Sequence, residues 1–393
     1  MTITHEKATQ AMALLHEFDL DCWLTFVRET SVTPDPGVDM AVGVDVTWPS
    51  AFLSFRAGTR VAIIGRYDAP DVRHSAIFDE VIAYDAGISA DLRAVLTRHD
   101  PQTIGLNYSV DDKTSDGITH GMWLMLHELL RDTPFPARFV SAGPLLSALR
   151  ARKTTSEVDA IRAAVATTEE IINLIDAELR VGRSEAAIGS FVHAEFARRG
   201  VGTAWSYDGC PIVNTGPESE PGHAAPRADL LIAPGHIVHI DLGVQQDGFC
   251  SDIQRLWYVR RAGEDAAPPE IQRAFDTVLM AIDACAAALR PGVAGHAIDT
   301  IAREVVVDHG YPEYLHAVGH GLGRAAHDGG PLLGPRWERY GNTPDMLVEA
   351  GHVYTLELGV MTSAGYVGLE EDVLVTDDGC VFLSTQQRTL RYL

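Results

Sequence analysis

The second half of the chain carries apolar side chains at helical spacing. From Ser156 to Ile175, valine and isoleucine lie at helical spacing, and we expect Ser156 to cap this helix. An apolar stripe of this kind is typical of a helix face that packs on a core. Three more segments show the same pattern, and a glycine lies within three residues of the end of each. These segments are residues 184–199, 269–289 and 295–309.

The first 150 residues alternate shorter helical and strand patterns. This alternation is typical of a small α/β domain with a largely parallel or mixed sheet. Residues 35–39, Asp-Pro-Gly-Val-Asp, are predicted to form a loop with both aspartates in solvent. The predicted helices span residues 6–18 and 122–130, and the predicted strands span residues 22–27, 61–64 and 104–106.

Between the later helices, an Asp-Gly pair at residues 247–248 predicts a β-hairpin whose arms carry two acids. If residues 246–247 form the two-residue loop, Asp241 lies directly opposite Asp252. If residues 247–248 form it, the two acids are diagonal neighbours on one face. In either register their Cβ atoms lie roughly 5 to 8 Å apart.

A second hairpin follows near the end of the chain. Residues 353–356 and 373–375 are β-rich, with turn chemistry between them. A loop centred on residues 363–364 places Glu357 opposite Glu370. Helices packed outside an antiparallel sheet therefore make this half α+β, and one acid hairpin in each part of it is consistent with pseudo-two-fold construction.

These four acids are joined by His320, in the segment Gly-His-Gly-Leu-Gly. A lone acid or histidine is usually solvated or structural, but five such residues on matched hairpins and a glycine-rich motif indicate a site. Buried acids that gather at one point repel each other unless divalent cations lie between them. Four carboxylates and one imidazole suit two Mn, Co or Zn ions, which activate water for hydrolysis.

In this order, the five residues resemble the pita-bread metallopeptidases, which include Xaa-Pro dipeptidase (prolidase), aminopeptidase P, methionine aminopeptidase and the metal-free creatinase. The resemblance covers about residues 155–393. It implies a pita-bread catalytic domain, residues 151–393, after a smaller α/β N-terminal domain of the creatinase/prolidase kind, residues 1–150. It also implies two divalent metal ions, with manganese preferred over zinc or cobalt, held by Asp241, Asp252, His320, Glu357 and Glu370.

Further roles follow from the same resemblance. Asp252 and Glu370 are expected to bridge the ions, and Glu357 to shuttle protons as well as bind metal. Three histidines match family positions near the substrate: His223, His316 and His327. From charge alone, Arg336 or Arg339 could clamp a substrate carboxylate, although surface arginines are at least as common.

The expected reaction is hydrolysis of the bond before proline in Xaa-Pro dipeptides by a hydroxide held between the ions. Glu357 takes its proton and passes it to the leaving nitrogen. His223 and His316 stabilise the oxyanion or position the peptide, and His327 contacts the carboxylate side of the substrate. The alternatives are aminopeptidase P activity on longer Xaa-Pro peptides, a creatinase-like hydrolase or a lyase on a small carboxylated substrate, and a non-catalytic peptide-binding module.

The intact ligand set counts against creatinase chemistry and against a binding module, whereas a lyase could retain it. Three positions depart from the family pattern: Gly368 replaces a common arginine, Gln254 a common threonine and Asp328 a more frequent glutamate. None of these removes a ligand. They leave substrate preference and the surroundings of the ligands open.

Composition sets the remaining limits. With 393 residues the chain is long enough for two domains, and its net charge of −23 argues against nucleic-acid or anionic-membrane partners. Five scattered cysteines, no secretory signal and no apolar run of membrane-spanning length favour a cytoplasmic protein with reduced thiols. The resemblance implies a homodimer.

Overall fold

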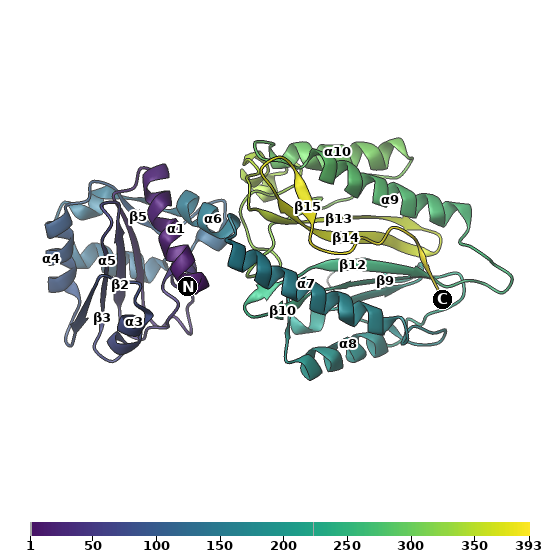
Figure 1. Ribbon diagram of the computed structural model, residues 1–393, viewed down its shortest axis with the longest axis horizontal. Helices are drawn as coiled ribbons and strands as arrows, with labels where there is room; N and C mark the ends of the chain where they lie inside the picture. Colours follow the sequence, from purple (N-terminus) through teal and green to yellow (C-terminus); the bar gives the residue numbers. More distant parts are fainter. Residues whose placement is uncertain (1, 223) are drawn as a thin grey trace. The chain divides into compact units, whose positions relative to one another are not determined.

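The computed structural model describes residues 2–222 and 224–393. Its chain forms two compact units, Met1–Arg150 and Ala151–Leu393 (Figure 1). Each unit has its own sheet and its own buried apolar clusters.

The first unit is built on a six-stranded mixed sheet in the order β4-β3-β2-β1-β5-β6. Its central strand β1 (Cys22–Val27) pairs antiparallel with β2 (Ser50–Phe55) and parallel with β5 (Ile104–Leu106). Every residue of β1 is buried, because helices cover both faces of the sheet. The other strands are β3 (Arg60–Gly65), β4 (Glu80–Tyr84) and β6 (Phe139–Ser141). The helices are α1 (Ile3–Glu17), α2 (Pro36–Ala41), α3 (Ala69–Ser75), α4 (Ser89–His99), α5 (His120–Leu129) and α6 (Gly143–Ala151), with short 3₁₀ turns η1 (Lys113–Ser115) and η2 (Phe135–Arg138).

The prediction of a loop with two solvated acids at residues 35–39 is wrong in two respects, since Pro36–Ala41 form helix α2 and Asp35 is buried. Asp35 caps the short helix α2, with Pro36 at its first position, and its side chain is only 2% exposed. Asp35 Oδ1 accepts hydrogen bonds from Gly37 N (2.8 Å) and Asn107 Nδ2 (2.7 Å). Asp35 Oδ2 has no hydrogen-bond partner in the described parts of the chain. Only Asp39 is exposed, as expected.

The second unit contains a seven-stranded sheet whose main path is β13-β14-β12-β9-β8. Its pairings are antiparallel except for that of β12 with β16. Its strands are β8 (Ile212–Thr215), β9 (Ile237–Leu242), β12 (Ile253–Tyr258), β13 (Val353–Thr362), β14 (Gly365–Val375), β15 (Cys380–Phe382) and β16 (Arg391–Tyr392). A small sheet adds β7 (Gly202–Thr203), β10 (Val244–Gln246) and β11 (Phe249–Cys250).

Four long helices pack on these sheets. Figure 1 shows α9 (Pro269–Ala288) and α10 (Gly295–Asp308) beside β13 and β14, where their apolar faces form one buried cluster. The other two, α7 (Thr155–Ile175) and α8 (Glu185–Arg199), contact β10 and β8 respectively. None of the helices in residues 2–222 and 224–393 is both long and apolar enough to cross a membrane. Three 3₁₀ turns complete this unit, η3 (Tyr207–Gly209), η4 (Glu338–Tyr340) and η5 (Thr343–Asp345).

The N-cap of helix α7 lies two residues before the expected one. Thr154, rather than Ser156, is its N-cap, since the Thr154 hydroxyl and the Glu157 side chain each accept from the other residue's backbone N–H. This reciprocal pair satisfies two amides that would otherwise lack partners, which Ser156 could not do from inside the first turn. Helix α8 ends as predicted, at Gly200, which adopts the left-handed conformation with φ of 70°.

The two hairpins decide where the acids lie. Asp247 and Gly248 both have positive φ, 52° and 80°, so they form the two-residue turn. Asp241 therefore pairs with Gln254, and Asp252 lies diagonal to it, which is the second of the two registers considered. In the other hairpin, Glu357 pairs directly with Glu370, as the turn at residues 363–364 predicted.

The buried Asp35 predicts a pH-dependent weakness of the first unit. Burial raises the pKa of Asp35 to about 6, so the folded state holds this proton more tightly than the unfolded state. Its contribution to stability is greatest below pH 4 and is lost as the pH rises to 6, a change on the order of 3 kcal/mol. We expect Asp35→Asn to protect the β1 amides from hydrogen exchange, relative to the parent protein, more at pH 8 than at pH 4.

Mass spectrometry of peptides that cover Cys22–Val27 measures this protection. Asp39→Asn, on the exposed side of the same helix, is the matched control. Its ratio of exchange rates, variant to parent, should be equal at the two pH values. Equal ratios for Asp35→Asn as well would contradict the assignment.

Candidate metal centre

Four acids meet on neighbouring strands of the second unit. Asp241 lies near the end of β9, Asp252 immediately precedes β12, and the Glu357–Glu370 pair spans β13 and β14. Strand β12 runs between β9 and β14, so it brings the two hairpins together. The residue on β12 that pairs with both Asp241 and Glu370 is Gln254.

His320 reaches the acids from a glycine-rich loop that lies along β13. Thr355 N donates to His320 O (3.0 Å), and His320 N donates to Thr355 Oγ1 (3.3 Å). Gly319 must be glycine, because a Cβ there would lie 2.0 Å from Thr355 O. The close approach of the two backbones therefore fixes the position of the imidazole.

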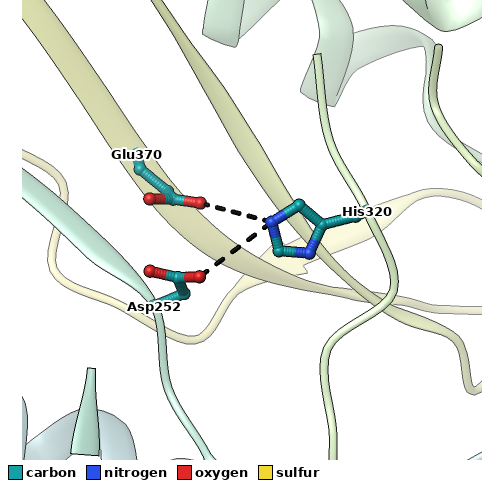
Figure 2. A group of neighbouring side chains, drawn as sticks. All are labelled: Asp252, His320 and Glu370. Atoms are coloured by element: carbon teal, nitrogen blue, oxygen red, sulfur yellow. Dashed lines mark ion pairs between the residues drawn. The ribbon is translucent and has the colours of Figure 1, made fainter. Parts of the chain in front are cut away.

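The His320 ring points its Nε2 atom at three carboxylates. Nε2 lies 3.5 Å from Glu357 Oε1, 3.9 Å from Asp252 Oδ2 and 4.0 Å from Glu370 Oε1. Figure 2 shows the side chains of Asp252, His320 and Glu370 converging on one point, and their ligand atoms all lie within 4.8 Å of one another. On the other side of the ring, Nδ1 faces Gly321 O at 3.4 Å. The carbonyl favours the proton on Nδ1, which leaves the lone pair of Nε2 directed at the acids.

The acids are buried and only partly satisfied. Glu370 is 1% exposed and Asp252 is 6% exposed. One oxygen of each of three acids, Asp241 Oδ1, Asp252 Oδ1 and Glu370 Oε1, has no hydrogen-bond partner among the residues that the structure describes. Unpartnered carboxylate oxygens beside an imidazole lone pair repel each other but suit cations. The donor set therefore fits divalent metal ions.

The pKa values reflect the same crowding. Burial, followed by the charge of Glu357, raises the pKa of Asp241 to about 8. Burial and neighbouring acids also raise the pKa of Asp252 and of Glu370 well above the usual range. Burial lowers the pKa of His320 to about 3, so its imidazole is neutral and available as a ligand.

Two of the three further histidines belong to this region. The His327 ring meets the His320 ring edge to face, with centroids 4.3 Å apart, and His327 is exposed. His316 Nδ1 donates to Ala317 O (2.7 Å), and Arg303 donates to the His316 carbonyl (2.6 Å). His223 lies outside the described residues.

A buried ion pair holds the loop that carries His320 and His327. Lys153 Nζ lies 2.7 Å from Asp328 Oδ2, and both side chains are almost fully buried. Asp328 also accepts from Ala325 N (3.3 Å), and its own N–H donates to Gly321 O (2.8 Å). Asp328, one of the departures from the family pattern, thus has a structural role in this loop.

The two arginines considered for a carboxylate clamp have other partners. Arg336 is exposed, and it donates to Asp345 Oδ1 (2.6 Å) and contacts His296 Nε2 (2.8 Å). Arg339 donates to Leu315 O (2.6 Å). A role of Arg336 in substrate binding stays a prediction.

Two side chains beside the predicted ligands were not predicted from the sequence. His239 donates to Gln254 Oε1 (2.9 Å), and Asp372 accepts from Asp252 N (3.1 Å). The signal was available, because His239 and Asp372 lie two positions from Asp241 and Glu370, and alternate strand residues share a face. Burial lowers the pKa of His239 to about 4, so it too is neutral.

Comparisons with known proteins agree with this geometry. The sequence model of metallopeptidase family M24 matches residues 159–377. Over 266 residues, 67% of this chain and 68% of the relative, the chain is 32% identical to the Bacillus subtilis (strain 168) protein named "Putative dipeptidase YkvY". It is 28% identical to the Xaa-Pro dipeptidase of Pyrococcus furiosus over 255 residues, 64% of this chain and 68% of that relative.

Among solved structures, the chain is similar to an Xaa-Pro dipeptidase from Bacillus anthracis, with a TM-score of 0.77 and 22% identity. That match covers 99% of this chain and 100% of the other. It confirms the expected fold, which is α+β with a pita-bread C-terminal part after a smaller α/β N-terminal part.

The raised carboxyl pKa values predict that metal binding releases protons. Cations bind the deprotonated acids, so apparent affinity should weaken as the pH falls below about 8, the pKa of Asp241. Titration of Mn into chelator-treated protein, by calorimetry in buffers of different ionisation enthalpy, should show at least one proton released at pH 6.5 and fewer at pH 9. Asp247→Asn, at the exposed turn of the first hairpin, should behave as the parent protein. A proton count of zero at both pH values would refute this.

Proposed function

Because the chain belongs to metallopeptidase family M24, we propose that it is a dinuclear peptidase that releases proline from Xaa-Pro dipeptides. The observation that carries the proposal is the convergence of a neutral imidazole and carboxylates, three of which keep one oxygen without a hydrogen-bond partner among the described residues. The Xaa-Pro dipeptidases among its relatives support the substrate class.

We assign the metal ligands to the five residues predicted from the sequence: Asp241, Asp252, His320, Glu357 and Glu370. Two divalent cations bound there would polarise the peptide carbonyl and activate water at neutral pH. Manganese is our first choice, with zinc and cobalt as alternatives, because carboxylate-rich ligands suit manganese. The homodimer and the cytoplasmic location stay predictions from the sequence.

Glu357 is best placed to move protons. Its side chain is 21% exposed, whereas that of Glu370 is 1% exposed and that of Asp252 is 8% exposed. Glu357 therefore combines contact with the cluster with access to an incoming peptide. It can take a proton at a carboxylate oxygen from the attacking water and deliver it to the leaving nitrogen of proline.

The histidines complete the proposed site. His327 is exposed beside His320, so its ring can contact a peptide that lies over the cluster. His316 and His223 are proposed to donate hydrogen bonds to the carbonyl oxygen as negative charge develops on it. The Lys153–Asp328 ion pair would keep His327 at its position against His320 during turnover.

Substrate panels test the function directly. Chelator-treated protein reloaded with Mn should release free proline from Xaa-Pro dipeptides, measured by chromatography, and should leave Xaa-Ala dipeptides almost intact. Zn and Co reloading tests the choice of metal. Cleavage of Xaa-Pro tripeptides alone would assign the protein to aminopeptidase P activity instead. Failure to cleave any peptide with any of the ions would reject the peptidase and favour the lyase alternative.

Glu357→Gln tests the proton role. The amide cannot accept the proton, so we expect kcat to fall by about 100-fold or more. Metal content should be measured in the same sample, since Glu357 is also an assigned ligand. The matched control is Glu304→Gln, on the exposed side of α10, which should keep the parent kcat. A fully loaded Glu357→Gln variant with parent kcat would remove Glu357 from this role.

A further inference from the structure

One amide lies between the two glutamates of the centre. Gln254 is 5% exposed, and its Nε2 donates to Glu370 Oε2 (3.0 Å) and to Glu357 Oε2 (3.2 Å). An amide nitrogen carries two N–H groups, so both bonds form at once. A single side chain from β12 thus engages one oxygen of each acid on β13 and β14.

The orientation of this amide is fixed by residues on the side away from the glutamates. Gln254 Oε1 accepts from His239 Nε2 (2.9 Å), and the Asn214 amide oxygen lies 3.2 Å from His239 Nδ1. Tyr366 packs edge to face against the His239 ring, with centroids 5.0 Å apart. A flipped amide would turn Oε1 toward two carboxylates and Nε2 toward a ring N–H, so the observed orientation is strongly preferred.

Gly368 leaves the space that this arrangement needs. A Cβ at position 368 would lie 2.5 Å from Tyr366 Cε1, 3.0 Å from Gln254 Oε1 and 3.1 Å from His239 Nε2. Ring and amide would both have to shift to admit it. The two departures from the family pattern, at positions 254 and 368, are therefore parts of one local structure.

The consequence concerns which carboxylate oxygens face His320. With Oε2 of each glutamate bonded to Gln254, the Oε1 atoms of Glu357 and Glu370 are the ones directed at His320, at 3.5 and 4.0 Å. Building on the proposed metal centre, we propose that Gln254 is a positioning residue that fixes the orientation of the Glu357 and Glu370 carboxylates toward the ions. His239 holds Gln254 in this role, and Gly368 makes room for both.

Metal affinity is the direct readout. Gln254→Met keeps the length of the side chain and removes both N–H donors. Loss of groups that orient metal ligands costs 10- to 100-fold in affinity, so we expect at least one of the two ions to bind about 10-fold more weakly. Calorimetry with Mn alone measures this, and the visible absorption of Co-loaded protein reports the altered ligand geometry. Gln245→Met, exposed on the same hairpin, is the matched control and should bind both ions as the parent does.

A substitution on β14 tests the position of Gln254 in a second way. Gly368→Ala should weaken metal binding in the same direction, because its Cβ displaces Tyr366 or Gln254. If both changes act through the orientation of Gln254, the double variant should bind little more weakly than Gln254→Met alone. Gln254→Thr, which also lacks the amide but is favourable in a strand, provides a second test if Gln254→Met does not fold.

The outcomes separate this inference from the proposed function. If the parent protein binds two ions and cleaves Xaa-Pro dipeptides, but Gln254→Met and Gln254→Thr keep parent affinity within two-fold and parent Co absorption, only the role of Gln254 is rejected. Additive losses in the double variant would also reject it, because they would show two independent effects. If the parent binds no ions, the metal centre itself is wrong.

Discussion

The structure of the second unit depends on how it tolerates buried negative charge. Asp241, Asp252 and Glu370 each keep a carboxylate oxygen without a partner in the described chain, and their pKa values are raised because they are buried close together. Such a group is costly in a metal-free protein and favourable around divalent cations. Stability and chemistry are therefore linked at this point, since the ions that activate water would also relieve the repulsion between the acids.

The fold supplies rigid support for this charge. Strand β12 pairs with both β9 and β14, and the helices α9 and α10 seal the outer face of β13 and β14 with apolar side chains. His320 arrives on a loop that is fixed at one end by backbone pairing with β13 and at the other by the Lys153–Asp328 ion pair. Because each ligand is held by elements that pack independently, no single loop determines the geometry of the centre.

Polar residues beside the ligands further limit the orientation of the two glutamates. A chain of polar contacts runs from Ser219 through Asn214, His239 and Gln254 to the two glutamates, and each contact in it is a hydrogen bond except the 3.2 Å approach of the Asn214 amide oxygen to His239 Nδ1. The Ser219 hydroxyl and the Thr215 N–H also donate to the buried Glu185 at the start of α8. Glu185 therefore holds both ends of residues 215–219. The acids are thus connected to the segment that follows β8, and each member of the chain limits how the next can turn.

Periodic apolar residues and turn chemistry were enough to predict the four long helices of the second unit, its two hairpins and the α+β class, since these signals are local. In the first unit the same signals indicated α1 and α5 but not α2, α3, α4 or α6. They left two registers open for Asp241 and Asp252, placed Asp35 in solvent and passed over His239. The turn at residues 247–248 decided the register, and the packing of Asn107 against the α2 cap buried Asp35. Which strand lies beside which, and so which oxygen faces which nitrogen, depends on contacts between residues far apart in the chain, and only the folded protein contains that information.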